Sequence, residues 1–171
     1  MKHAVARKQP NSAMCFVCGL KNPASLRTAF YDLDNGGIAA LFTARDEHQG
    51  YPGRLHGGIA TALLDETMGR AIMSSKGAML FAVTVELATK FMKPIPLGVG
   101  LRVVGRVVGE DERSYEATGE LLLPTGEVAA TGAGKYVKLP IERIAGAELG
   151  DEQWAVSALP DDPLEIEVGG V

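Results

Sequence analysis

The sequence predicts an α+β domain in which an antiparallel sheet of about five to six strands wraps around one long helix. Between residues 56 and 75 lies one long stretch of helix-favouring residues that is apolar around most of its circumference. After Gly77, apolar residues alternate or run continuously in strand-length segments separated by short loops. Strands joined by short loops pair antiparallel, because a parallel pair needs a long crossover connection.

The 171 residues are expected to form one domain with a loose segment at each end. Residues 1–14 are polar, so we predict a flexible N-terminal arm there. The domain itself is predicted over residues 15–140. Residues 141–171 combine acidic side chains with two prolines and a terminal Gly-Gly, so we predict a mostly disordered acidic tail.

Local patterns place the elements in order along the chain. Ile38–Ala44 has strand character, and Arg45–Leu55 is a loop rich in turn formers, with Pro52-Gly53 as its strongest turn signal. The helix opens with His56-Gly57-Gly58 and runs to about Ser75. Four strands are predicted after it: Met79–Met92, Val99–Gly109, Ser114–Leu123 and Glu127–Lys138.

The helix is unusual because its apolar side chains point in most directions. These side chains are Ala60, Leu63, Leu64, Met68, Ala71, Ile72 and Met73. A helix that is apolar nearly all round is a buried helix. One sheet buries one helix on nearly all sides only by curling around it, which is the architecture of a hotdog fold.

Two adjacent carboxylates interrupt this helix. Adjacent helical residues point about 100° apart, so Asp65 and Glu66 cannot line the same site. Glu66 has Arg70 four residues later on the same face of the helix, which predicts an ion pair between them. Asp65 has no basic residue one turn away, and an unpaired carboxylate is costly to bury on an apolar helix. Asp65 is therefore a candidate functional residue, the alternative being an Asp that reaches solvent at a groove or bonds to Thr61.

The glycine pair at the helix start is a second candidate. The first N–H groups of a helix have no partner within it and carry the positive end of its dipole. Gly57 and Gly58 allow a ligand oxygen to approach this backbone, which suits the oxyanion formed when a thioester carbonyl is attacked. The alternative is a glycine pair that only packs against the sheet.

The spacing of these two candidates predicts a homo-oligomer. Gly57 and Asp65 are separated by roughly 12 Å along the axis at about 1.5 Å per residue. A base and an oxyanion site must both lie within about 3 Å of the reacting group, so one helix cannot supply both to one substrate. A two-fold dimer with antiparallel central helices would bring Gly57 of one subunit towards Asp65 of the other.

Composition argues against several classes of partner. Residues 1–141 contain 16 Lys and Arg against 13 Asp and Glu, whereas residues 142–171 contain one against eight. The slightly basic body suits a phosphate-bearing ligand, but no basic run with interleaved aromatics indicates nucleic acid. No apolar stretch approaches the ~20 residues of a membrane span, and the first residues do not form a signal peptide. We therefore expect a cytoplasmic protein.

Several stretches of the chain resemble hotdog thioesterases of the phenylacetic-acid-degradation (PaaI) type. The longest is His56–Glu66 (HGGIATALLDE), preceded by His48–Gly53 (HQGYPG). Val83–Glu86 and Phe91–Pro96 also match, and the similarity covers about residues 15–139. The resemblance implies an acyl-coenzyme A thioesterase that hydrolyses a thioester to a free acid and coenzyme A.

The resemblance also implies roles for single residues. In such enzymes the Asp nine residues after the motif His is the general base or nucleophile, which is Asp65 here. The Gly after that His supplies the oxyanion N–H, here Gly57, and His56 helps to position the carbonyl. A Ser or Thr on the next strand often holds the water or the carboxylate, and Thr84 occupies that position.

Further residues are candidates for substrate binding. Several relatives carry an Asn or Gln ahead of the motif His; Gln49 is the nearest candidate, because Gly50 stands where some relatives have the Asn. Gly58 belongs to the open helix start and is expected to contact the substrate. Arg54 and Lys93 are the candidates to bind the phosphates of coenzyme A. Met68, Ile72 and Phe81 are the candidates to line the acyl tunnel. No metal is required, and no cofactor is expected beyond the coenzyme A of the substrate. The oligomer is expected to be a dimer or a dimer of dimers.

Cys15 and Cys18 invite a zinc interpretation with His48 as a third ligand. Structural zinc normally takes four ligands from paired motifs, which this chain lacks. A redox dithiol of the thioredoxin kind would need a different fold context. Packing of the N-terminal arm is therefore the expected role of the two cysteines.

Two other functions remain open from the sequence. A non-catalytic hotdog module that binds acyl-coenzyme A would not need a costly carboxylate at Asp65. A hotdog hydratase or dehydratase usually has an Asp and a His close together on a loop and helix, and no His follows an Asp at this helix start. Thioester hydrolysis is the expected reaction.

Overall fold

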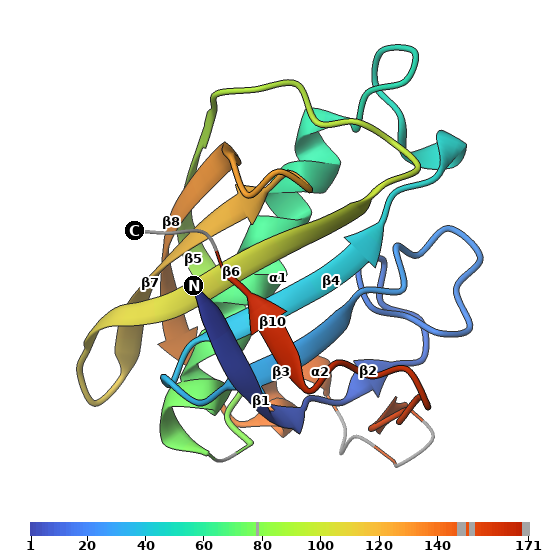
Figure 1. Ribbon diagram of the computed structural model, residues 1–171. Helices are drawn as coiled ribbons and strands as arrows, with labels where there is room; N and C mark the ends of the chain where they lie inside the picture. The colour runs from blue at the N-terminus through green and yellow to red at the C-terminus, as the bar shows by residue number, and fades with distance from the viewer. Residues whose placement is uncertain (78, 147–149, 151–152, 169–171) are drawn as a thin grey trace.

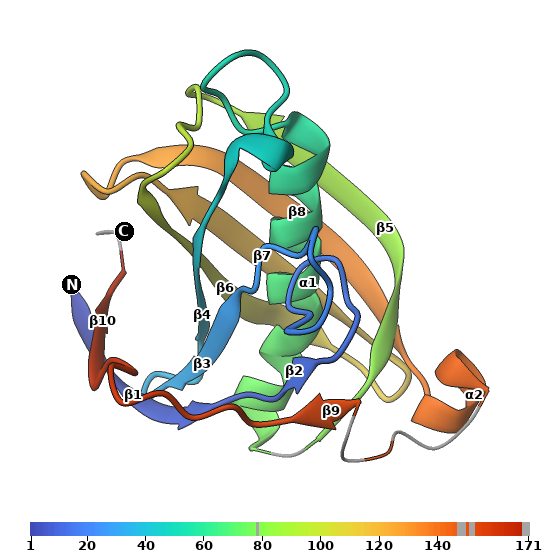
Figure 2. The same cartoon turned by 90° about the vertical axis from the view of Figure 1, so that its right-hand side faces the viewer.

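The computed structural model describes residues 1–77, 79–146, 150 and 153–168. Its main sheet has eight strands in the order β10-β1-β3-β4-β6-β7-β8-β5, and the pairs are antiparallel. The sheet curls around α1 (Gly57–Lys76), with β5 at one edge and β1 and β10 at the other (Figure 1, Figure 2). The predicted α+β class is confirmed, although the sheet has more strands than the five or six expected.

The part of the sheet nearest α1 follows the predicted segments closely. Its strands are β3 (Ala29–Leu33), β4 (Ile38–Thr43), β6 (Gly100–Glu110), β7 (Ser114–Leu122), β8 (Val128–Lys138) and β5 (Ala82–Phe91), with a short 3₁₀ helix, η1 (Asp46–His48), after β4. β3 was not predicted. Its residues from Phe30 to Leu33 are all buried, and burial on both faces removes the alternation by which a strand is detected.

The expected flexible arm over residues 1–14 is ordered instead. It contains β1 (Lys2–Lys8) and β2 (Asn11–Ser12). β1 pairs with β3 on one side and β10 on the other. Backbone hydrogen bonds to segments distant in sequence hold β1 in place. The polar side chains of the arm do not indicate this pairing.

The expected disorder of residues 141–171 does not hold for the described parts of the tail. These contain α2 (Ile141–Ala145), β9 (Trp154–Ala155), which pairs with β2, and β10 (Glu165–Glu167), which pairs with β1. Ile166 is buried, and the Trp154 ring packs edge-on against Phe81 with ring centroids 6.0 Å apart. Apolar contacts with the body of the domain therefore order a segment whose composition is that of a disordered tail.

An acidic contact also links the tail to the sheet. Asp162 accepts from Lys8 at 2.5 Å and from the Tyr31 hydroxyl at 2.7 Å. Desolvation raises the pKa of Asp162, but hydrogen bonds from the Leu159 backbone N–H, Lys8 and Tyr31 outweigh it and lower the pKa to about 2.

The core lies between α1 and the concave face of the sheet. The helix buries the following residues: Ala60, Leu63, Leu64, Thr67, Met68, Arg70, Ala71, Ile72 and Met73. Two strand glycines let the helix approach closely, because a Cβ at Gly132 would lie 2.8 Å from Met68 Cε and one at Gly119 would lie 3.1 Å from Met68 Cγ. The predicted buried helix is confirmed. In the described part of the chain no helix is both long and apolar enough to cross a membrane.

Candidate active site

Asp65 lies half-buried on α1, on the side that faces the β5–β8 edge of the sheet. The Thr84 hydroxyl donates to its Oδ1 at 2.8 Å. Thr84 on β5 and Tyr136 on β8 are cross-strand partners, and the Tyr136 hydroxyl lies 3.2 Å from the same Oδ1 and 3.2 Å from the Asp65 backbone oxygen. Two neutral hydroxyls therefore hold the carboxylate, and among the described residues no cation pairs with it.

Tyr136 is a residue that the sequence interpretation missed. It stacks on Tyr115 with ring centroids 5.0 Å apart, and the Tyr115 hydroxyl donates to the Gly69 backbone oxygen at 2.6 Å. Burial, and then the charge of Asp65, raise the pKa of Tyr136, so its hydroxyl stays protonated and donates. A tyrosine hydroxyl that is buried needs a hydrogen-bond partner. A tyrosine within the predicted strand Glu127–Lys138 is the sequence feature that could have pointed to this residue.

The start of α1 is exposed and has the polar groups expected of an anion site. His56 is the N-cap residue, and its Nδ1 accepts the Gly58 N–H at 2.9 Å. The N–H of Gly58, a predicted binding group, is therefore occupied within the chain. The Gly57 N–H donates no hydrogen bond within the described residues, which leaves it free for a ligand.

Gln49 and Gly50 support the loop ahead of the helix. Gln49 Oε1 accepts the Gly53 N–H at 3.3 Å, so its side chain stabilises its own turn. A Cβ on Gly50 would lie 3.2 Å from the Cα of His56. Close packing against the helix start explains the glycine at this position, and the structure does not bring Gln49 to Asp65 in any recorded contact.

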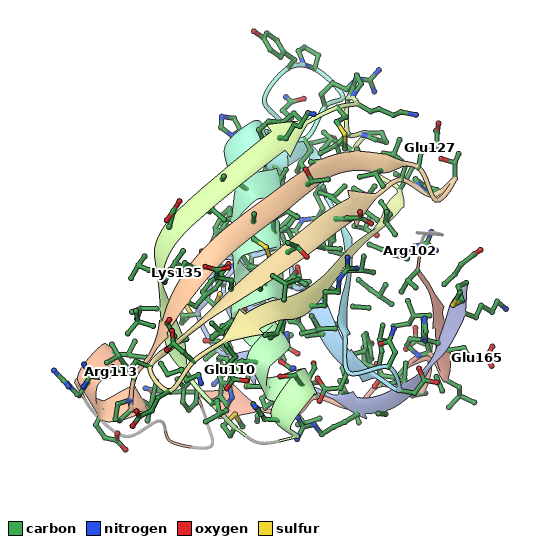
Figure 3. All side chains as sticks on the ribbon, turned by 90° about the vertical axis from the view of Figure 1, so that its left-hand side faces the viewer. Arg102, Glu110, Arg113, Glu127, Lys135 and Glu165 are labelled. Carbon is green, nitrogen blue, oxygen red and sulfur yellow. The ribbon has the colours of Figure 1, made fainter. Side chains whose placement is uncertain are left out.

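The two basic residues predicted to meet phosphates differ in their surroundings. Arg54 is exposed, and within the described residues its side chain donates one hydrogen bond, to the Gly53 oxygen at 3.4 Å. Lys93 forms an ion pair with Glu127, which lies at the β7–β8 turn (Figure 3). Arg54 is the freer of the two cations.

The predicted acyl-tunnel residues lie elsewhere in the single chain. Met68 and Ile72 are fully buried in the core against the sheet. Phe81 is half-buried and packs against Trp154 of the tail. Met68 and Ile72 therefore fill the core and do not line a cavity within the described part of the single chain, and a binding role for Phe81 stays a prediction.

The Cys15–Cys18 turn packs against α1 beside Glu66. Cys15 Sγ and Glu66 Oε2 are 3.1 Å apart, and Arg70 Nη2 lies 3.1 Å from Cys18 Sγ. His48 does not complete this cluster, because its Nδ1 accepts the Arg45 N–H and its Nε2 bonds to the Ala24 oxygen, each at 3.0 Å. The predicted Glu66–Arg70 ion pair is present at 2.8 Å.

Comparison with known proteins bears on this site. A family model described as the thioesterase superfamily matches residues 52–130, a range that contains His56, Gly57, Asp65 and Thr84. The resemblance to the thioesterase superfamily is confirmed. A thioesterase superfamily protein of known crystal structure is 28% identical with a TM-score of 0.66, over 72% of this chain and 62% of that one, so this chain spans less than two thirds of that protein.

More distant structures share the fold. The PaaI protein of E. coli, from the phenylacetic acid degradation operon, is 20% identical with a TM-score of 0.60, over 67% of this chain and 81% of that one. A Streptococcus mutans protein whose structure contains acetyl-CoA is 21% identical with a TM-score of 0.55, over 61% and 82%. No curated protein matches the chain. The hotdog fold is confirmed.

Proposed function

We propose that this protein is an acyl-coenzyme A thioesterase that works as a homodimer, or a dimer of dimers. Each site would combine Asp65 of one subunit with the α1 N-terminus of the other. One observation carries the proposal: Thr84 and Tyr136 hold the Asp65 carboxylate, and no cation among the residues that the structure describes neutralises it. A carboxylate in that state is a competent base or nucleophile.

The position of strand β5 supports the proposed geometry of the dimer. Near its start Thr84 contacts Asp65, and at its end the Phe91 ring would lie 3.4 Å from a Cβ at Gly57. A two-fold axis near Leu87 that pairs two β5 strands antiparallel sets position 84 of one strand opposite position 91 of the other. Gly57 of one subunit then approaches Asp65 of the partner subunit. The two groups can therefore act on one substrate, although roughly 12 Å separates them along a single helix.

The edge of β5 has the properties that such pairing needs. Within the described part of the chain β5 pairs only with β8, so its outer edge is open. Val85 is 56% exposed and Phe91 is 51% exposed along this ten-residue strand. An open edge strand with exposed apolar side chains is a liability in a monomer, and a second copy of the same edge covers it.

Hydrolysis at this site needs few groups. Asp65 takes a proton from water as the water attacks the thioester carbonyl, or attacks the carbonyl itself to form an anhydride that water opens. The Gly57 N–H donates to the oxyanion, and the carbon–sulfur bond breaks to release a thiolate that takes up the proton. Because His56 Nδ1 accepts the Gly58 N–H, the neutral ring has its proton on Nε2 and can donate it to the carbonyl oxygen.

Two observations support coenzyme A as the thiol that hydrolysis releases. The hotdog neighbour from Streptococcus mutans holds acetyl-CoA. Residues 1–141 have a net charge of +3, and Arg54 is exposed beside the helix start, which suits a polyanionic leaving group.

Thiol release from a panel of acyl-coenzyme A substrates tests the proposal, with Asp65→Asn compared with the wild type. We expect turnover of at least one substrate, and a loss of at least ~10²-fold in the variant while binding persists. Glu116→Gln is the matched control, because it neutralises an exposed carboxylate of β7 next to the inward-facing Tyr115. Tight binding without turnover of any thioester, unaffected by Asp65→Asn, would overturn hydrolysis in favour of a non-catalytic acyl-coenzyme A-binding module.

A further inference from the structure

Cys15 and Cys18 lie on one tight turn against the Glu66 side of α1. The turn is closed by the Gly19 N–H, which donates to the Cys15 oxygen at 2.8 Å. A Cβ on Gly19 would lie 2.3 Å from that oxygen, so the turn requires glycine there. The two sulfurs and a Glu66 oxygen all lie within 4.8 Å of one another. The turn therefore holds two thiols close together beside a carboxylate.

Donors converge on both sulfurs. The Val17 N–H points at Cys15 Sγ at 3.3 Å, and the Ser12 N–H points at Cys18 Sγ at 3.4 Å. The Arg70 guanidinium lies 3.1 Å from Cys18 Sγ. Packing of two small apolar side chains needs none of these contacts, whereas N–H groups and a guanidinium stabilise negative charge on sulfur during reaction.

The two thiols differ in the way that an attacking and a resolving thiol differ. Cys15 is half-buried, and Cys18 is completely buried. The hydrogen bond with Cys18 lowers the pKa of Cys15 in spite of its burial and the nearby Glu66 charge. The same hydrogen bond, together with burial, raises the pKa of Cys18. The accessible thiol is thus the more readily ionised one.

The surroundings favour this chemistry over a metal ion. Arg70 already neutralises Glu66 through two hydrogen bonds of 2.8 and 3.0 Å, and its guanidinium also faces Cys18. A metal ion at the sulfurs would meet this fixed positive charge. Both ring nitrogens of His48 are bound to the backbone, so His48 supplies no further ligand.

We propose that Cys15 and Cys18 form a thiol–disulfide exchange site for the disulfides of small thiols, with Cys15 attacking and Cys18 resolving. The Cys15 thiolate attacks one sulfur of a disulfide such as oxidised glutathione, whose sulfur–sulfur bond breaks to release one thiolate. Cys18 then loses its proton to water and attacks Cys15 Sγ, releasing the second thiolate. Two protein thiols are oxidised, one small disulfide is reduced to two thiols, and no metal or further oxidant takes part. The site is independent of the proposed hydrolysis.

Intact-mass measurement of the reduced full-length protein tests this, because the chain contains only two cysteines. The protein is incubated with oxidised glutathione in the presence of a chelator and then alkylated. We expect a monomeric-chain product that has lost two hydrogen atoms and takes up no alkylating agent, and that returns to the dithiol with reduced glutathione. A chain that stays a dithiol at every glutathione ratio, or a stoichiometric zinc ion that protects both thiols before chelation, would overturn the proposal.

Two variants test the order of attack. Cys18→Ser should retain a stable glutathione adduct on Cys15, whereas Cys15→Ser should form at least ~10-fold less adduct in the same time. If the serine at the buried position prevents folding, peptide mapping of the wild type after limiting iodoacetamide replaces it, with Cys15 modified at least ~10-fold faster than Cys18. Equal reactivity of the two cysteines contradicts the proposed roles.

Discussion

Asp65 and Glu66 are adjacent on α1, yet their carboxylates meet opposite surroundings. Asp65 faces β5 and β8 and accepts from two neutral hydroxyls. Glu66 faces the Cys15–Cys18 turn and accepts two hydrogen bonds from the guanidinium of Arg70, whose side chain is 4% exposed. A carboxylate held only by neutral donors is available as a base or a nucleophile, whereas a carboxylate paired with a buried cation stabilises the fold. The comparison separates a reactive side of the helix from a structural side.

Complementation between two inactive variants tests the reactive side most strongly. Gly57→Pro removes the free N–H at the first helical position, where proline is tolerated, and the extended backbone of His56 suits a residue before proline. Alone it should lower kcat by about 10²- to 10³-fold, as should Asp65→Asn. A hybrid dimer of the two variants has one intact site, made of Asp65 from the Gly57→Pro subunit and Gly57 from the other. We expect it to recover roughly half of the wild-type rate.

The control for this experiment is each variant mixed with itself, which should stay inactive. A hybrid that is as inactive as its parents would show that both groups act within one chain. The cross-subunit arrangement would then be wrong even if Asp65 is essential.

Glu66→Gln tests the structural side. The amide keeps the shape of the side chain but leaves the buried guanidinium of Arg70 without a counter-charge. We expect the free energy of unfolding to fall by about 2 kcal/mol, measured by urea denaturation at fixed protein concentration. Asp65→Asn, measured in parallel, should change it by less than ~0.5 kcal/mol. Equal stabilities of the two variants would remove the distinction between the two sides of α1.

Tyr136→Phe gives a smaller effect on the reactive side. The variant keeps the stacking on Tyr115 and removes one hydroxyl from Asp65. We expect about a 10-fold loss in kcat, because one of the two hydroxyls that orient the carboxylate is lost. Tyr115→Phe is the matched control, since its hydroxyl bonds to the Gly69 oxygen and not to Asp65. An unchanged kcat would reduce Tyr136 to a packing role.

The two sides of α1 also differ in how far the sequence reveals them. Spacing alone predicted the Glu66–Arg70 pair. The helix pattern made Asp65 and Gly57 candidates, and the match to a family motif added Thr84. Tyr136 lies 71 residues from Asp65, and only the pairing of β5 with β8 brings it there. The same holds for β1 and β10, whose order depends on partners at the other end of the chain. Periodicity reports burial within a segment, and it carries no signal for pairing over such separations.

Asp162 extends the comparison to a carboxylate outside the helix, with both a cation and a hydroxyl as donors. Its pKa of about 2 in the folded protein lies below the usual value of 3.8. Its contribution to stability is therefore complete above about pH 4 and is lost as the pH falls through about 2. We expect backbone amides of β10 to exchange hydrogen faster as the pH is lowered across this window, after correction for intrinsic rates. Asp162→Asn should exchange faster at neutral pH and lose most of the acid dependence, while the amides of α1 stay unchanged. An acid response of β10 that persists in Asp162→Asn would assign it to other carboxylates of the tail, such as Glu165.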